Sequence, residues 1–243
     1  MVLEFAPMKI PMLLLLALLS VFALAAQTAA PDAVDMTAEP SHHLAIENQY
    51  VRVFKVEFAP HAVSLMHRHA HDYFFVSIGP ASIENDVAGK PPATPKLENG
   101  ETRFTPGNFS HIVKNLGDTT FRNVTIELLQ DEKARQSPPP PWDEERGVTT
   151  FTGGTRDTLF VKDGVRAADI QIQPGVTVPK HSHSGPHLVV AVTDLDLRSD
   201  IEGQGAKSEQ LKAGDVAWVQ GGITHTVTNV GKQPARLIIF EFH

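Results

Sequence analysis

Two stretches of this sequence repeat one pattern of residue types at a constant offset of 114 positions. The matched pairs include His67 and His181, His69 and His183, Gly100 and Gly214, His111 and His225, and Asn115 and Asn229. So many matches at one offset, without a gap, indicate a tandem duplication rather than chance. Each copy is therefore expected to form the same fold.

Within each copy the pattern is that of short strands. Val and Phe alternate with Arg, Lys and Glu along residues 52–58, with a slip at Phe54, and residues 168–173 alternate without a slip. Residues 236–242 have the apolar pattern of a buried strand. Turn-forming Gly, Pro, Asn and Asp separate such runs, and no stretch after residue 30 has the pattern of a long amphipathic helix. These features predict an all-β fold of sandwiches or barrels.

The N-terminus has the pattern of an export signal. An apolar run, residues 10–26, follows Lys9, and small residues at Ala23 and Ala25 fit a signal-peptidase site. We expect residues 1–25 to be a cleaved signal peptide, which places the mature protein in the periplasm or outside the cell. An uncleaved anchor is the alternative, but the run is at the short limit for spanning a bilayer. No stable membrane anchor is then expected after cleavage.

The repeat divides the rest of the chain into segments. Residues 26–45 lack periodicity and are expected to be a disordered lead-in. Residues 46–129 form the first predicted domain and residues 160–243 the second. Between them, residues 130–159 include four consecutive prolines at 138–141, which favour a semi-rigid polyproline spacer. An alternative is a strap that packs Trp142 against a domain.

Composition excludes several classes of function. The formal net charge of −7 argues against a nucleic-acid partner, because such a protein needs a basic surface. The chain has no cysteine, so disulfide scaffolds, thiol nucleophiles and Cys-ligated zinc are excluded. It has 12 histidines, and any metal it binds must be held by nitrogen or oxygen donors.

The repeated histidines have the spacing of a metal site. Side chains two apart on a strand share one face, so His181 and His183 supply two convergent imidazoles. A third follows 42 residues after His183, at His225, and His187 lies on the same face as a candidate fourth ligand. The first copy repeats the set with three histidines and a tyrosine: His67, His69, His111 and Tyr73. We predict a divalent transition metal (Fe, Zn, Ni, Cu or Mn) in each copy. Tyr73 is either a hydrogen-bonding group beside the metal or barrel packing.

These motifs resemble those of the cupins, and the chain is similar to a two-domain cupin, or bicupin. The matching residues are Gly175, His181, His183, Gly214, Gly222, His225 and Asn229 in the second copy, and His67, His69, Gly79, Gly100, Pro106, His111 and Asn115 in the first. The departures are His187, Thr193 and Gln220 for the family Glu, Gly and Pro in the second copy, and His61, Tyr73 and Asn108 for Gly, Glu and Gly in the first. The resemblance implies two tandem jelly-roll (double-stranded β-helix) barrels, each with a metal inside.

The absence of the family Glu from both copies bears on the chemistry. Neutral imidazoles leave a divalent metal its full charge, which favours anionic chelating ligands. Our first hypothesis is a dioxygenase-type enzyme that acts on a small anionic or phenolic substrate, since the resemblance extends to three-His iron dioxygenases. A metal-dependent isomerase or lyase and a non-catalytic periplasmic metal- or ligand-binding protein are the alternatives. The expected partner is a small molecule, and the chain is expected to be a monomer or a homodimer.

Overall fold

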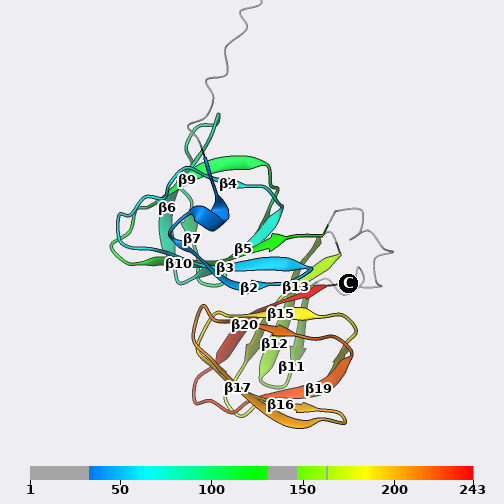
Figure 1. The fold of residues 1–243 in the computed structure, drawn as a ribbon. Helices are drawn as coiled ribbons and strands as arrows, with labels where there is room; N and C mark the ends of the chain where they lie inside the picture. Colours follow the sequence, from blue (N-terminus) through cyan, green and yellow to red (C-terminus); the bar gives the residue numbers. More distant parts are fainter. Residues whose placement is uncertain (1–32, 131–146, 163, 243) are drawn as a thin grey trace, which may run out of the picture. The chain divides into compact units, whose positions relative to one another are not determined.

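The computed structural model describes residues 33–130, 147–162 and 164–242, and its strands close into a barrel in each copy (Figure 1). The first copy contains β1 (Val34–Asp35), the 3-10 turn η1 (Met36–Ala38), β2 (His42–Glu47), β3 (Val51–Phe58), β4 (His67–His69), β5 (Tyr73–Ile78), β6 (Ala81–Val87), β7 (Lys96–Leu97), β8 (Thr102–Thr105), β9 (Phe109–Asn115) and β10 (Phe121–Leu128). The second contains β11 (Gly147–Phe151), β12 (Gly154–Lys162), β13 (Val165–Ile172), β14 (Thr177–His183), β15 (His187–Ala191), β16 (Leu195–Ile201), β17 (Gly205–Leu211), β18 (Val216–Val219), β19 (Ile223–Asn229) and β20 (Ala235–Phe242).

The offset of 114 positions found in the sequence is also the offset between equivalent strands. β3, β6, β8, β9 and β10 begin and end 114 residues before β13, β16, β18, β19 and β20. Each copy pairs its strands into two sheets, β1-β4-β9-β6-β7 with β2-β3-β10-β5-β8 in the first and β14-β19-β16-β17 with β11-β12-β13-β20-β15-β18 in the second. The fold is two tandem cupin barrels, so the all-β prediction and the duplication are confirmed.

Several strands are buried on both faces. In β3, Phe54 packs inside the first barrel, whereas Val53 points to a separate cluster that residues of both copies form. β20 divides in the same way, because Ile239 faces its own barrel and Phe240 faces the shared cluster. In that cluster the rings of Phe74 and Phe240 stack with centroids 5.2 Å apart. The alternation slips at Phe54 because the consecutive residues Val53 and Phe54 face two different apolar clusters.

The first described residues form secondary structure where a disordered lead-in was expected. Residues 33–45, part of the expected disordered lead-in, contain β1, η1 and the beginning of β2. Met36 is buried in the first barrel's core, Val34 pairs with His67, and β2 pairs with β3. These pieces are too short to show periodicity, and they are held by tertiary contacts that a local pattern does not record.

The segment expected to link the domains is also shorter than predicted. β11 and most of β12 lie within residues 130–159, yet both belong to the large sheet of the second copy. β12 pairs with β13 as β2 pairs with β3, so the second barrel repeats the extra strand of the first. The proline run lies outside the described residues, as does the expected signal peptide. Among the described residues, no helix has the length and hydropathy needed to cross a membrane.

Two of the departures from the family motif, His61 and Asn108, fall at turns with left-handed backbone. His61 and Asn108 have φ of 59° and 60°, and the equivalent Gly175 and Gly222 have φ of 74° and 76°. Asn and His enter this region more readily than most residues other than Gly. Both substitutions therefore keep the turn.

A buried asparagine stabilises the same turn in each barrel through side-chain hydrogen bonds. The Asn229 side-chain amide donates to the carbonyls of Ile172 and Gln233, at 3.0 and 2.8 Å, and its oxygen accepts from the Gly231 N–H. Asn115 makes the equivalent bonds in the first barrel. A buried carbonyl that loses its donor is costly, which explains why this residue type occurs in both copies.

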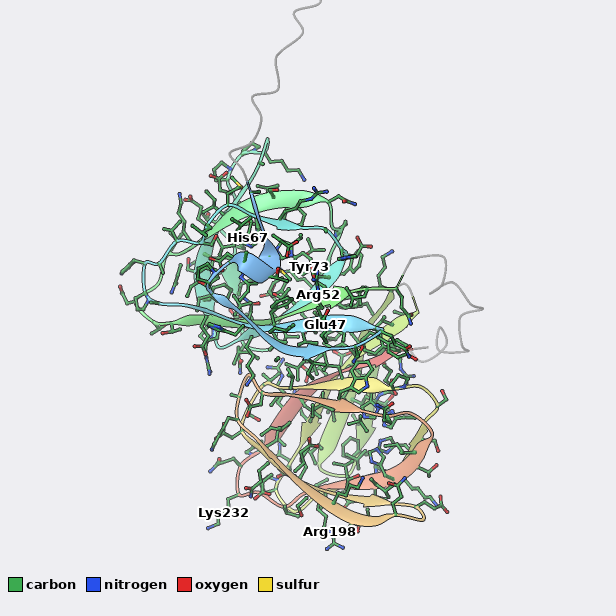
Figure 2. All side chains as sticks on the ribbon, viewed as in Figure 1. Glu47, Arg52, His67, Tyr73, Arg198 and Lys232 are labelled. Carbon is green, nitrogen blue, oxygen red and sulfur yellow. The ribbon has the colours of Figure 1, made fainter. Side chains whose placement is uncertain are left out.

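We predict that Asn229→Ala lowers the free energy of unfolding by about 1–3 kcal/mol, because it leaves buried carbonyls without donors. Urea denaturation measures the change. Lys232→Ala, at an exposed position of the same turn (Figure 2), is the control and should change stability by less than about 0.5 kcal/mol. Equal effects of the two substitutions would contradict this role for Asn229.

Candidate metal centres

The histidine pair of the second copy lies at the end of β14, next to β19. His181 and His225 are direct partners in the register of these antiparallel strands. His183 is two residues further along β14 and shares the inner face of the barrel with His181. Strand pairing therefore brings together three imidazoles that lie up to 44 residues apart in the sequence.

Each of these rings is oriented through its Nδ1 atom. The Nδ1–H of His181 donates to the Pro179 carbonyl at 2.7 Å, and that of His183 donates to Glu241 Oε1 at 2.6 Å. Nδ1 of His225 lies 2.7 Å from the Ser199 hydroxyl. Glu241 is itself held by Arg166, whose Nε donates to Oε2 at 2.6 Å. Fixing one ring nitrogen in this way leaves Nε2 as the free donor, as in histidines that bind metals.

The three Nε2 atoms converge. His181, His183 and His225 each offer a ligand atom within 4.8 Å of the other two, and Nε2 of His225 lies 3.1 Å from Nε2 of His181. Nε2 of His183 is buried without a hydrogen-bond partner. Buried polar atoms rarely lack a partner, and a metal 2.0–2.1 Å from each nitrogen, roughly the usual Zn–N distance, would supply one. These residues therefore fit a divalent metal ion.

His187 lies beside this triad. Its ring stacks on that of His183 with centroids 4.2 Å apart, and its Nδ1 is buried without a hydrogen-bond partner. It is not among the three residues whose ligand atoms lie within 4.8 Å of one another. Its role as a fourth ligand stays a prediction.

The first barrel repeats the arrangement with β4 and β9. His67 and His111 are direct partners in the register, and Nε2 of His111 lies 2.9 Å from Nε2 of His67 and 3.1 Å from Nε2 of His69. Nδ1 of His67 donates to the Leu65 carbonyl and Nδ1 of His111 donates to Asn85 Oδ1. Their Nε2 atoms then face each other as lone pairs, which repel unless a cation lies between them. Two nitrogens that bind one metal at about 2.1 Å lie about 3.0–3.4 Å apart, depending on the angle between them, and the observed distances are close to this range.

Burial keeps these rings neutral. It lowers the pKa of His111 to about 2 and of His69 to about 3, and the neighbouring histidines add to the shift. In the second barrel burial lowers the pKa of His187 to about 3 and of His225 to about 4. Burial alone would raise the pKa of Glu241, but His183 and Arg166 outweigh it and lower that pKa to about 2. The result is neutral imidazole donors with one ionised carboxylate behind them.

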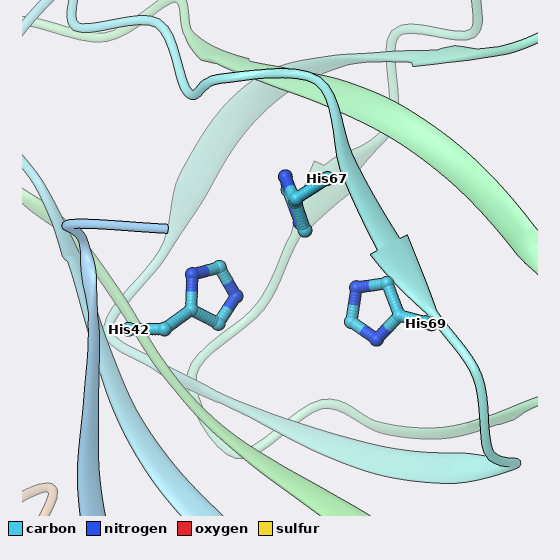
Figure 3. A group of neighbouring side chains, drawn as sticks. All are labelled: His42, His67 and His69. Carbon is cyan, nitrogen blue, oxygen red and sulfur yellow. The ribbon is translucent and has the colours of Figure 1, made fainter. Parts of the chain in front are cut away.

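Sequence reasoning missed one residue of the first centre. His42, on β2, offers a ligand atom within 4.8 Å of those of His67 and His69 (Figure 3). The residue 114 positions later is Arg156, so the repeat gave no signal for His42. Tyr73 stacks on His69 with ring centroids 4.4 Å apart, in the place that His187 takes beside His183. Burial raises its pKa to about 12, so Tyr73 is a neutral phenol.

The two centres differ most in the space around them. In the second barrel the three histidines line a cavity of about 610 Å³, whereas the cavity at the first centre is about 80 Å³. Phe58, Phe75 and Phe121 line the first cavity. The residues 114 positions later are the smaller Ile172, Val189 and Ala235. Figure 2 shows His67 and Tyr73 among the side chains that fill the first barrel.

Known proteins share this fold. Residues 168–241 match the family described as Cupin domain. An oxalate decarboxylase from Bacillus subtilis with Mn(II) centres aligns at a TM-score of 0.58 and 13% identity, over 84% of this chain and 77% of that one. An oxalate decarboxylase from Lactobacillus farciminis aligns at a TM-score of 0.59 and 15% identity, over 83% of this chain and 84% of that one. A cupin 2 conserved barrel domain protein from Leptotrichia buccalis aligns at a TM-score of 0.52 and 11% identity, over 83% of this chain and 88% of that one. No curated protein matches the sequence. At these identities the likeness shows the fold.

We predict that the metal-free protein loses stability as the pH falls from about 6.5 towards 4. The folded state holds histidines with lowered pKa values neutral, while the unfolded chain binds protons at its ordinary pKa of 6.5. The free energy of unfolding should fall by at least about 1 kcal/mol per pH unit in this window. Urea titrations at pH 7, 6 and 5 measure it, and a value independent of pH would contradict neutral buried rings.

Proposed function

We propose that the second barrel is the active site of an exported, metal-dependent enzyme that acts on small organic anions with an apolar body. One observation carries the proposal. Three imidazoles converge on one point, and that point borders a cavity of about 610 Å³. Such a volume is in the usual range for small-molecule sites.

The cavity lining supports the substrate class. Most of its wall is aliphatic or aromatic, including Ile170, Leu197 and Trp218, and Lys207 and Glu209 add one basic and one acidic side chain. A metal held by neutral ligands keeps its full positive charge, so an enolate, phenolate or carboxylate is attracted to it. The apolar wall would contact the body of the substrate and exclude water from the reacting end.

Residues around the triad orient its imidazoles for a metal. A bound divalent metal supplies Lewis acidity toward an anionic oxygen and, for a redox-active ion, access to O2 chemistry. Glu241 holds His183 in one tautomer and one orientation. The Pro179 carbonyl does the same for His181, and the Ser199 hydroxyl orients the ring of His225. His187, whose Nδ1 has no hydrogen-bond partner, is placed beside the triad where that atom can bind a polar group of the substrate.

A dioxygenase-type reaction is the first candidate. The triad carries no carboxylate ligand, and the cavity leaves room for a substrate beside the metal. The metal is a divalent transition ion, and we propose Fe(II) for this chemistry. Export follows from the N-terminal apolar run and small residues, which would bring the chain to the periplasm or outside the cell.

A metal-dependent lyase or isomerase is the second candidate. The observation in its favour is the unpartnered Nδ1 of His187 at the cavity wall, which could hydrogen-bond to a substrate whose rearrangement on the metal needs no oxidant. The solved structures with this fold include oxalate decarboxylases, which act on a small carboxylate. Oxalate itself is small and doubly charged, and it matches a large apolar cavity poorly.

Oxygen uptake tests the first candidate. The full chain loaded with Fe(II) should consume O2 in the presence of catechols, gentisate or 1,3-diketones, and His183→Ala should abolish the uptake because it removes a ligand. Arg198→Ala, exposed on the second barrel (Figure 2), should leave uptake unchanged. Loss of substrate without O2 uptake would replace the dioxygenase by the lyase or isomerase. Binding without turnover would leave a non-catalytic carrier.

A second measurement tests the architecture of the centre. Glu241→Gln removes the charge behind His183 and should weaken metal binding at the second barrel by about 10–100-fold. Competition with a colorimetric chelator measures the affinity. Glu209→Gln, an exposed carboxylate at the cavity wall, is the matched control and should leave the affinity unchanged. Equal affinity for the wild type and Glu241→Gln would show that this carboxylate does not act on the metal.

A further inference from the structure

His42 comes from outside the repeated motif, yet it lies in the interior of the first barrel. Its side chain is only 4% exposed, although its neighbour His43 on the same strand is exposed. Figure 3 shows the ring of His42 facing those of His67 and His69. Its ring centroid lies 4.9 Å from that of His67 and 6.3 Å from that of His69.

The ring is held as a ligand would be. Nδ1 of His42 lies 2.8 Å from Glu39 Oε2, and the Glu39 side chain is only 2% exposed. A second oxygen of that carboxylate accepts from the Leu65 N–H at 3.4 Å, directly before β4. An Nδ1–H bound to a buried carboxylate leaves Nε2 of His42 as a free donor toward the other rings, which is the arrangement of His183 and Glu241 in the second barrel.

Four imidazoles therefore line one small cavity. The ligand atoms of His42, His67 and His69 lie within 4.8 Å of one another, and Nε2 of His111 lies about 3 Å from two of them. The cavity at this point is about 80 Å³, and its wall includes Phe58, Phe75 and Phe121. Four histidines around so small a cavity fit a closed site, and closed coordination is typical of structural metal ions.

We infer that the first barrel holds a structural divalent ion of the zinc class, and that His42 is the fourth ligand, which fastens residues 34–47 to the barrel. β1 has only two residues and η1 only three, so few backbone bonds hold this segment before β2. A coordinate bond from His42 would add a constraint to the pairing of β2 with β3. The second barrel has Arg156 in place of His42 and keeps an open site.

This inference is independent of the catalysis proposed for the second barrel. The first ion stabilises the fold and the second centre binds substrate, so the failure of one assignment leaves the other standing. The test therefore uses metal release and backbone protection and needs no substrate.

The experiment loads the full chain with two equivalents of Zn²⁺ and follows release to a colorimetric chelator. We expect two phases, a fast one from the open centre and a slow one from the closed centre. His42→Ala should accelerate the slow phase by at least about 100-fold and leave the fast phase unchanged, because a first ligand contributes more than the 10–100-fold of an outer partner. His43→Ala, on the same strand with its side chain exposed, should leave both phases unchanged.

Hydrogen exchange of residues 33–47 is the second readout. Exchange should become faster in His42→Ala and in chelated wild-type protein, and should stay slow in zinc-loaded His43→Ala. Glu39→Gln keeps the ring and removes its carboxylate, so it should accelerate the slow phase by about 10-fold even if His42→Ala does not fold. Wild-type release and wild-type exchange in either His42→Ala or Glu39→Gln would overturn the assignment.

Discussion

The fixed orientation of buried imidazoles is the constraint on which both centres depend. An imidazole has two nitrogens, and a hydrogen bond from Nδ1 to a carbonyl, amide or carboxylate directs Nε2 of His67, His111 and His183 to the centre, whereas Nδ1 of His69 has no such partner. Burial then removes the option of protonation, since charging these rings away from water is unfavourable. What is left is a group of neutral donors at ligand spacing. Strand register supplies the remaining condition, because His67 faces His111 and His181 faces His225 across paired strands.

The same arrangement of histidines lies in an open cavity in one barrel and in a small cavity in the other, because the surrounding side chains differ. Aromatic side chains and His42 fill the first interior, and aliphatic side chains leave the second open. Replacing Phe58 by the equivalent Ile172 removes volume without changing the strand, so a duplicated barrel can change its interior while its backbone stays the same. The left-handed turns at His61 and Asn108 show the converse, in which the residue changes and the conformation is kept.

Much of this could be predicted from the sequence, for physical reasons. The HxH pairs and the histidines 42 residues later were found because they occur on strands and occur twice. His42 could not be found, because its counterpart is Arg156 and its partners are distant in the sequence. The lead-in and linker were placed wrongly, since β1, η1 and β11 are too short for periodicity. The size of each cavity depends on packing across the barrel, which a single sequence does not specify.

Because several strands are buried on both faces, neither copy covers its own apolar surface when separated from the other. Val51, Phe74, Val124 and their counterparts in the second copy form one cluster with no exposed member. A single copy made alone would present that cluster as an apolar sheet face to water, a surface that promotes self-association. Joining the two copies in one chain covers this face at any protein concentration, whereas two separate barrels would cover it only by associating.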